Sequence, residues 1–233
     1  MALPQLHTST YELELPSTGE TVKYRPFLVK EQKLLMIAQE SDDQKQMEQA
    51  VADIITACTF GEIDPYKIPL FDIELLFLRI RGKSVGDTVE LNVLCPDDNE
   101  TRVPVKIELD KIDILQREEH TNEISLTDDI SMVMKYPTLT SMAGFDDRGE
   151  VMNTFDMVKD CIYEIHSGED IYNRVDVSDK ELEEFIGEMS PQNFEEVSKF
   201  FETMPKLIHA VEVKNPKTKK KGSVVLEGLA SFF

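Results

Sequence analysis

The amino-acid sequence predicts an α+β protein with several β-hairpins and two helical clusters, and without a doubly wound parallel sheet. Pairs of segments in which apolar and polar residues alternate flank turn-forming residues at three places. Other segments carry an apolar residue at every third or fourth position, which is the pattern of a helix with one buried face. Strands and helices are therefore segregated along the chain, whereas a doubly wound sheet requires them to alternate.

The first half of the chain combines two hairpins with a group of helices. Residues 11–15 and 21–25 alternate around the turn sequence STGE. Three helices are expected to follow, over 29–39, 43–59 and 70–81. The third should begin after Pro69 and end at Gly82, because proline suits a helix start and glycine a helix end. A second hairpin is expected over 87–95 and 101–109, with Pro104 marking an edge strand.

The second half is predicted to be mainly helical and to end in a third hairpin. A strand is expected over 130–136 and a helix over 150–166. Ser178 with Glu181 forms a capping box, and Ser190-Pro191 begins another helix. The last hairpin joins 208–213 to 223–227 through a lysine-rich loop. Because the stretch around 110–125 is polar and acidic, we expect two domains, 1–115 and 116–233.

The charge of the chain is strongly acidic and unevenly distributed. Its 45 Asp and Glu against 25 Lys and Arg give a formal charge of −20, which disfavours binding to nucleic acid or to an anionic membrane surface. Residues 111–213 hold 24 acids and 9 bases, whereas 214–221 hold five lysines and no acid. No apolar run reaches the ~18 residues of a membrane span. Three scattered cysteines and the lack of a signal-peptide pattern indicate a protein made in a reducing cytoplasm.

No arrangement of residues in the sequence indicates catalysis, a metal or a cofactor. The four histidines lie far apart, and Cys161 and His166 do not share a helix face. Glycine-rich phosphate-binding motifs are missing from the sequence. Cys95 has no CxxC partner, so a zinc site is not expected there. We therefore predict that the chain is not an enzyme and that it uses no cofactor.

The candidate binding residues are those of the lysine loop and the aromatic end of the chain. The loop is open to three interpretations: a solvated hairpin tip, a contact to an acidic protein, or a contact to nucleic acid, although it lacks the aromatic residues that stack on bases. A terminal aromatic pair is expected to be buried, either on its own chain or on a neighbour. The candidate residues are Lys214, Lys217, Lys219, Lys220, Lys221, Phe232 and Phe233.

Several segments resemble the T4-type phage baseplate protein family. The first carries Arg25-Pro26-Phe27, followed by Lys30-Glu31 and the pair Leu34-Leu35. The second is the segment IPLFDIELLFLRIRGKSVGDTVEL, with these matching positions: Phe71-Asp72, Glu74, Phe77, Arg79-Ile80-Arg81, Lys83-Ser84 and Gly86. Tyr136-Pro137 and the ending LEGLASFF fit the same pattern. The resemblance covers most of residues 10–140 and the last ten or so.

The resemblance implies a structural component of the tail baseplate hub of contractile-tailed phages, located in the virion and assembled in the host cytoplasm. Its partners would be other hub or tape-measure proteins, and a homo-oligomer within the baseplate is an open alternative. A second implied role is that of an assembly chaperone that binds the hub or the tape-measure protein and then leaves. Family members with cysteine pairs in the middle and C-terminal hairpins would hold zinc, but this chain retains only Cys95 there.

Overall fold

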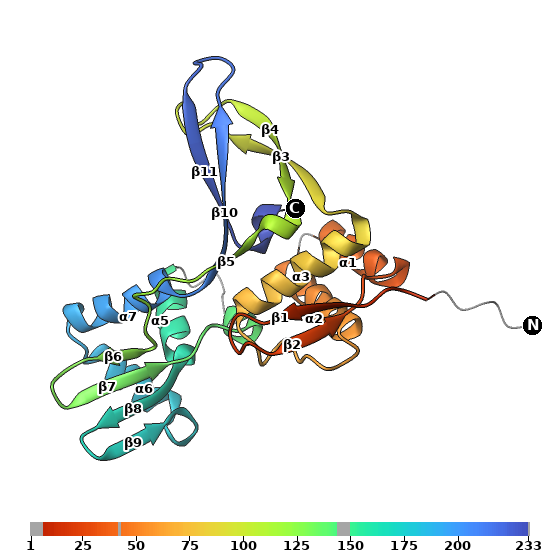
Figure 1. Ribbon diagram of the computed structural model, residues 1–233. Coiled ribbons are helices and arrows are strands. Elements are labelled where there is room, and N and C mark those ends of the chain that lie inside the picture. The colour runs from red at the N-terminus through yellow and green to blue at the C-terminus, as the bar shows by residue number, and fades with distance from the viewer. Residues whose placement is uncertain (1–6, 42, 144–149, 233) are drawn as a thin grey trace, which may run out of the picture. The chain divides into compact units, whose positions relative to one another are not determined.

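The computed structural model describes residues 7–41, 43–143 and 150–232 and shows a mixed α+β protein (Figure 1). The described strands form four small sheets, and all of their pairings are antiparallel. The predicted fold class is confirmed. The chain divides into two compact units: unit 1 comprises residues 1–115 and 206–233, and unit 2 comprises residues 116–205. Among the described residues, no helix is both long and apolar enough to cross a membrane.

The described residues of unit 1 form three hairpins, three helices, a short further strand and two short 3₁₀ turns. The hairpins are β1 (Tyr11–Glu14) with β2 (Thr21–Tyr24), β3 (Thr88–Leu94) with β4 (Arg102–Glu108), and β10 (Lys206–Lys214) with β11 (Lys221–Glu227). The helices are α1 (Val29–Ser41), α2 (Gln44–Cys58) and α3 (Leu70–Val85). The remaining elements are η1 (Leu109–Lys111), β5 (Asp113–Leu115) and η3 (Leu229–Phe232). All three predicted hairpins and the three predicted helices are present.

The third helix is longer than predicted. It continues through Gly82 and ends at Val85, with Gly86 as the C-cap at a φ of 117°. A residue with a side chain rarely adopts that φ, so Gly86 is the glycine that ends the helix. At Gly82 a Cβ would lie only 3.0 Å from a carboxylate oxygen of Asp87, so this glycine permits a close approach instead.

The C-terminal hairpin belongs to unit 1, not to a second domain over 116–233 as expected from the sequence. Strand β10 pairs with β5, with Lys206 opposite Leu115 and Ile208 opposite Asp113. Its apolar residues then complete a core shared with α3, β3 and β4. Because these pairings join residues about 90 positions apart, the polar stretch at 110–125 marks only one of the two crossings between the units.

Residues of the segments that carry the family resemblance connect the elements of unit 1 through ion pairs and hydrogen bonds. Arg25 makes an ion pair of 3.0 Å with the buried carboxylate of Glu31 at the start of α1. Ser17, in the first hairpin turn, donates from its hydroxyl and its backbone N–H to the buried carboxylate of Asp72 in α3. The guanidinium of Arg79 donates to the carbonyl oxygens of Leu109 and Ile112, each at 2.6 Å. The first hairpin is thereby fixed on helix α3.

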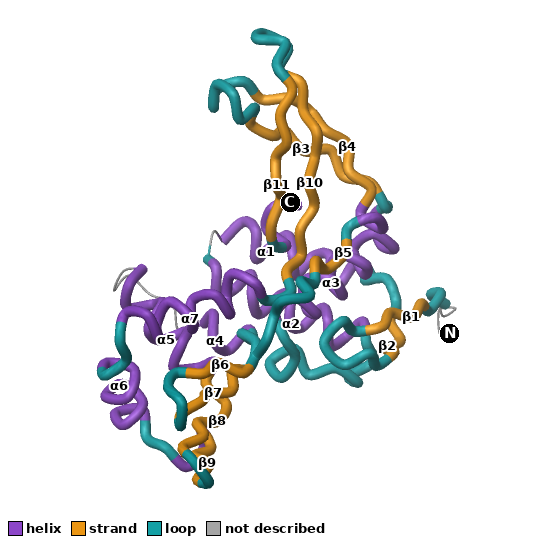
Figure 2. Tube along the Cα trace, turned by 60° about the vertical axis from the view of Figure 1, so that its left-hand side comes forward, coloured by secondary structure: helices purple, strands orange, loops and turns teal. Residues whose placement is uncertain are grey.

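Unit 2 packs helices on one face of a four-stranded sheet (Figure 2). Its strands are β6 (Glu123–Ser125), β7 (Ile130–Met134), β8 (Ile162–Ser167) and β9 (Asp170–Asn173), in that order across the sheet. Its helices are α4 (Leu139–Ala143), α5 (Glu150–Cys161), α6 (Asp179–Gly187) and α7 (Pro191–Thr203), with a 3₁₀ turn, η2 (Arg174–Asp176). The predicted capping box at Ser178 and the cap at Ser190 are both confirmed.

The helix predicted over 150–166 is wrong in its last five residues. Helix α5 ends at Cys161, and the chain enters β8, which pairs with β7. Ile162 and Ile165 are buried in the strand, as they would have been in the helix. A spacing of three residues suits both interpretations here, because a bulge at Val133/Met134 shifts the register. The pairings of β8 with β7 and β9 distinguish the strand from the helix.

Candidate functional site: two paired hairpin turns

The candidate site lies where the turn of the β3–β4 hairpin meets the turn of the β10–β11 hairpin. Both turns begin with a residue followed by proline, Cys95-Pro96 in one and Asn215-Pro216 in the other. In each, the residue four positions on donates its backbone N–H to the carbonyl of the first residue, Asn99 to Cys95 and Lys219 to Asn215. Asn99 and Lys219 both have positive φ values, 52° and 64°. The first five residues of the two turns share these features. The first turn is one residue longer, because Leu94 pairs with Arg102 whereas Lys214 pairs with Lys221.

Asn215 joins the two turns. Its side chain is buried, with 1% of its surface exposed. Its amide nitrogen donates to Asp97 Oδ1 at 2.9 Å and to Asp98 Oδ2 at 2.8 Å. Its amide oxygen accepts the backbone N–H of Lys217 at 2.8 Å. A buried amide whose donors and acceptor are all used holds both turns in one arrangement.

Two further contacts hold the turns together. The hydroxyl of Thr218 donates to Asp97 across the junction. Gly222, at the start of β11, lies against the ring of Pro96, and a Cβ at this position would approach Pro96 Cγ to 2.6 Å. Glycine is therefore required here by close packing and not by its backbone angles.

The hydrogen bonds at the junction determine the ionisation of its acids. The hydroxyls of Thr218 and Thr101, with the amide of Asn215, hold the pKa values of Asp97 and Asp98 below their usual range. Burial and the two neighbouring carboxylates raise the pKa of the Cys95 thiol. Cys95 therefore stays protonated at neutral pH, which suits neither a nucleophile nor a metal ligand. Within the described ranges, no three His, Cys, Asp or Glu side chains are arranged to hold a metal ion.

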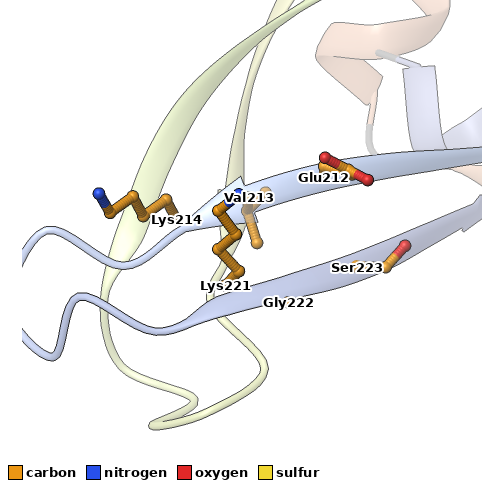
Figure 3. A pocket seen from close by; sticks show the side chains of 6 residues that line it. All are labelled: Glu212, Val213, Lys214, Lys221, Gly222 and Ser223. Carbon is orange, nitrogen blue, oxygen red and sulfur yellow. The ribbon is translucent and has the colours of Figure 1, made fainter.

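The junction presents the predicted lysine loop to solvent. We call Lys214, Lys217, Lys219, Lys220 and Lys221 the lysine turn; all five side chains are exposed. In the part of the chain that the structure describes, none of them forms an ion pair. Lys214 and Lys221 occupy directly opposite positions of the two strands. The two lysines border an open hollow of 360 Å³. Its lining residues, drawn in Figure 3, are Glu212, Val213, Lys214, Lys221, Gly222 and Ser223.

The aromatic end of the chain lies away from this turn. Phe232 is fully buried in the core of unit 1, together with Leu207 and Leu226. The preceding residues are fixed by Glu74 of α3, whose carboxylate accepts the backbone N–H of Leu229 at 2.9 Å. The structure therefore places Phe232 in the core of its own chain and not on a partner-binding surface. Phe233 lies outside the described residues.

Asn215, Asp97 and Asp98 are not predicted from the sequence as a connected group. The sequence does contain one signal for such a group. The two turn segments, CPDDNET and NPKTKKK, both have proline as their second residue. The acidic excess is concentrated elsewhere. Unit 2 holds 22 acids and 7 bases, a formal −15, whereas unit 1 holds 23 acids and 18 bases, a formal −5.

A scan against protein-family models identifies the family. The model described as T4 bacteriophage base plate protein matches residues 8–233, nearly the whole chain. This chain belongs to the T4 bacteriophage base plate protein family. No curated protein and no solved structure matches the chain significantly.

Membership in the T4 baseplate family gives the protein a structural or assembly role in the phage baseplate. Its partners are therefore other baseplate proteins, and the family is one of structural proteins. The matched residues include both hairpin turns and the ion pairs and hydrogen bonds that connect the elements of unit 1. These contacts therefore belong to the part of the chain that matches the baseplate family.

Proposed function

We propose that this protein is a structural subunit of the baseplate hub, acting in tail assembly through protein–protein contacts. In this proposal the lysine turn binds a carboxylate-rich surface of a neighbouring hub or tape-measure protein. It needs no catalytic residue, metal or cofactor, and it does not involve nucleic acid. Family membership supports a role in the baseplate, and a place in the hub is the further step proposed here.

The observation that carries the proposal is the concentration of unpaired cations on a rigid turn. The chain has 45 acidic residues, yet none of the described ones pairs with the lysine turn. Like charges directly opposite one another in a hairpin are destabilising, as with Lys214 and Lys221. An acidic partner would relieve that repulsion. Because Asn215 already fixes the backbone, little conformational entropy would be lost when the partner binds.

The second candidate is an assembly chaperone that binds the hub or the tape-measure protein and then leaves. The formal −15 of unit 2 favours it, because a strongly acidic surface can hold a basic partner by charge and release it when a competing contact forms. Detecting the protein by mass spectrometry in purified phage particles supports the hub subunit. Finding it only in the infected lysate supports the chaperone.

The contact itself is tested with a variant in which Lys217, Lys219, Lys220 and Lys221 are replaced by Ser. The matched control replaces four exposed lysines elsewhere: Lys23, Lys45, Lys106 and Lys180. We expect the first variant to lower the yield of assembled tails and the control to leave it unchanged. Recovery of baseplate partners by affinity capture should fall in the same variant and with rising salt. Equal yields and equal recovery for both variants would contradict the proposed contact.

A further inference from the structure

Helix α1 exposes most of its apolar side chains. Only Glu31 and Ala38 are fully buried in this helix. Four large apolar side chains are exposed instead: Val29, Leu34, Met36 and Ile37. Protein helices gain most of their stability by burying an apolar face, and an exposed apolar face of this kind marks an interaction surface.

Part of this exposed face is self-complementary in charge. Val29, Lys33, the adjacent pair Met36 and Ile37, and Glu40 are separated by steps of three or four residues. They therefore form one stripe along the helix, which we call the α1 stripe. Met36 and Ile37 are at the centre of the stripe. Lys33 lies three positions before Met36, and Glu40 lies three positions after Ile37. Lys33 and Glu40 are seven positions apart in the sequence. This separation corresponds to roughly 10 Å along the helix, too far for an ion pair within one chain. Neither charge pairs with any described residue.

We propose that the α1 stripe binds the α1 stripe of a second copy, with the two helices antiparallel and related by a two-fold axis. An axis passing between Met36 and Ile37 places Met36 against Ile37 of the partner subunit. The same axis places Lys33 opposite the partner's Glu40, and symmetry repeats this ion pair on the other side. In a two-fold dimer the same surface of each subunit forms the interface, so that surface must be complementary to itself. Parallel helices would instead place lysine beside lysine and glutamate beside glutamate.

The charge of the whole chain does not prevent this association. Helix α1 belongs to unit 1, which has a formal charge of −5, whereas unit 2 has −15. At physiological salt, charges more than ~8 Å apart are largely screened. One helix face buries less area than a standard protein interface of about 1,600 Å², so the dimer is weak and reversible. The inference is independent of the proposed contact of the lysine turn.

The experiment is sedimentation velocity of the full chain over a series of protein concentrations at physiological salt. We expect the wild type to shift from monomer to dimer as concentration rises. Met36→Asp should remain monomeric, because it places two carboxylates at the centre of the interface. The matched control is Val175→Asp, which changes a side chain that is 90% exposed in unit 2 and should leave dimerisation unchanged. Circular dichroism establishes that both variants are folded.

A charge exchange tests the orientation of the helices. Lys33→Glu and Glu40→Lys should each raise the dimer dissociation constant roughly tenfold, because each creates two like-charge pairs. The double variant exchanges the charges and should restore the wild-type dissociation constant. A chain that is monomeric at every concentration overturns the proposal. A dimer that persists in Met36→Asp, or a double variant no better than the single ones, overturns it as well.

Discussion

The backbone N–H of Phe27 donates a hydrogen bond of 2.8 Å to the hydroxyl of Ser84, 57 residues further along the chain. Phe27 is the last residue of the Arg-Pro-Phe segment, and Ser84 lies in the last turn of α3. The same hydroxyl donates to the carbonyl of Ile80 at 2.6 Å. Two segments that carry the family resemblance are therefore connected directly through one serine.

Replacing Ser84 by Ala should destabilise the protein. The buried N–H of Phe27 would lose its acceptor, at a cost of about 1–2 kcal/mol in the free energy of unfolding. Urea denaturation measures this loss. Ser223→Ala is the control, because Ser223 is exposed and its hydroxyl makes no hydrogen bond with the described residues. Equal unfolding curves for the two variants would show that the hydrogen bond contributes nothing.

Glu74 should make stability depend on pH. Burial raises the pKa of its carboxyl from 4.5 to about 7, although the N–H of Leu229 partly opposes the shift. A raised pKa favours the folded state at low pH, and this contribution is lost as pH rises from about 4.5 through about 7.

Replacing Glu74 by Gln removes the buried charge while keeping an acceptor for Leu229. We expect Glu74→Gln to match the wild type near pH 5 and to exceed its stability at pH 8 by on the order of 1–3 kcal/mol. Denaturation at both pH values measures the difference. Glu62→Gln, at an exposed position, is the control and should show no such gain. A Glu74→Gln variant that is no more stable than the wild type at pH 8 would contradict the assignment.

Gly222→Ala should loosen the paired turns. The added methyl group would lie 2.6 Å from Pro96 Cγ, and relieving this overlap costs about 1–3 kcal/mol. Gly187→Ala is the control, because its added Cβ would have no atom within 4 Å apart from its own helix backbone and chain neighbours. Thermal unfolding should separate the two variants. Adding Pro96→Ala to Gly222→Ala should recover part of the loss, and a failure to recover it would show that the strain lies elsewhere.

Asn215 should tolerate alanine better than aspartate at neutral pH. Alanine removes the hydrogen bonds to Asp97 and Asp98, at about 1–3 kcal/mol. Aspartate removes the same donors and adds a third carboxylate beside the other two, so its cost at pH 7 should be larger.

The difference between Asn215→Asp and Asn215→Ala should shrink as the pH falls and the carboxylates become protonated. The wild type itself should lose stability at acidic pH. Asp97 and Asp98 have lowered pKa values in the folded state, so their contribution is present above about pH 3.8 and is lost below it. Denaturation at pH 7 and at a pH well below 3.8 measures these effects. If aspartate costs no more than alanine at pH 7, the two turns are not joined through their carboxylates.

Local patterns in the sequence were sufficient for most elements of the fold. The alternation in 11–25 and 87–109, the helical stripes of 29–59 and the caps at Ser178 and Ser190 all gave elements of the correct type. The same patterns failed at Ile162 and Ile165, because a buried residue at spacing three suits a helix and a bulged strand alike. They also placed the end of α3 at Gly82, because composition does not show which glycine adopts a positive φ.

The lysine turn could be predicted from the sequence, but the hydrogen bonds that hold it in place could not. Five lysines within eight residues are visible in the composition of 214–221. In the sequence, Asn215 is one polar residue of a loop. Only the fold places it beside Asp97 and Asp98, which lie more than 110 positions earlier. The burial of Phe232 in its own core likewise depends on β10 returning to β5.

By itself, the sequence determined the α+β class, the three hairpins, the acidic charge and the resemblance to baseplate proteins. These features depend on residue type and short-range periodicity, which a single chain displays directly. Only the tertiary structure decided that the last hairpin belongs with residues 1–115, that two distant turns form one junction and that α1 leaves its apolar stripe uncovered. Each of these depends on which distant segments come into contact, and contact between distant segments is set by the packing of the whole chain.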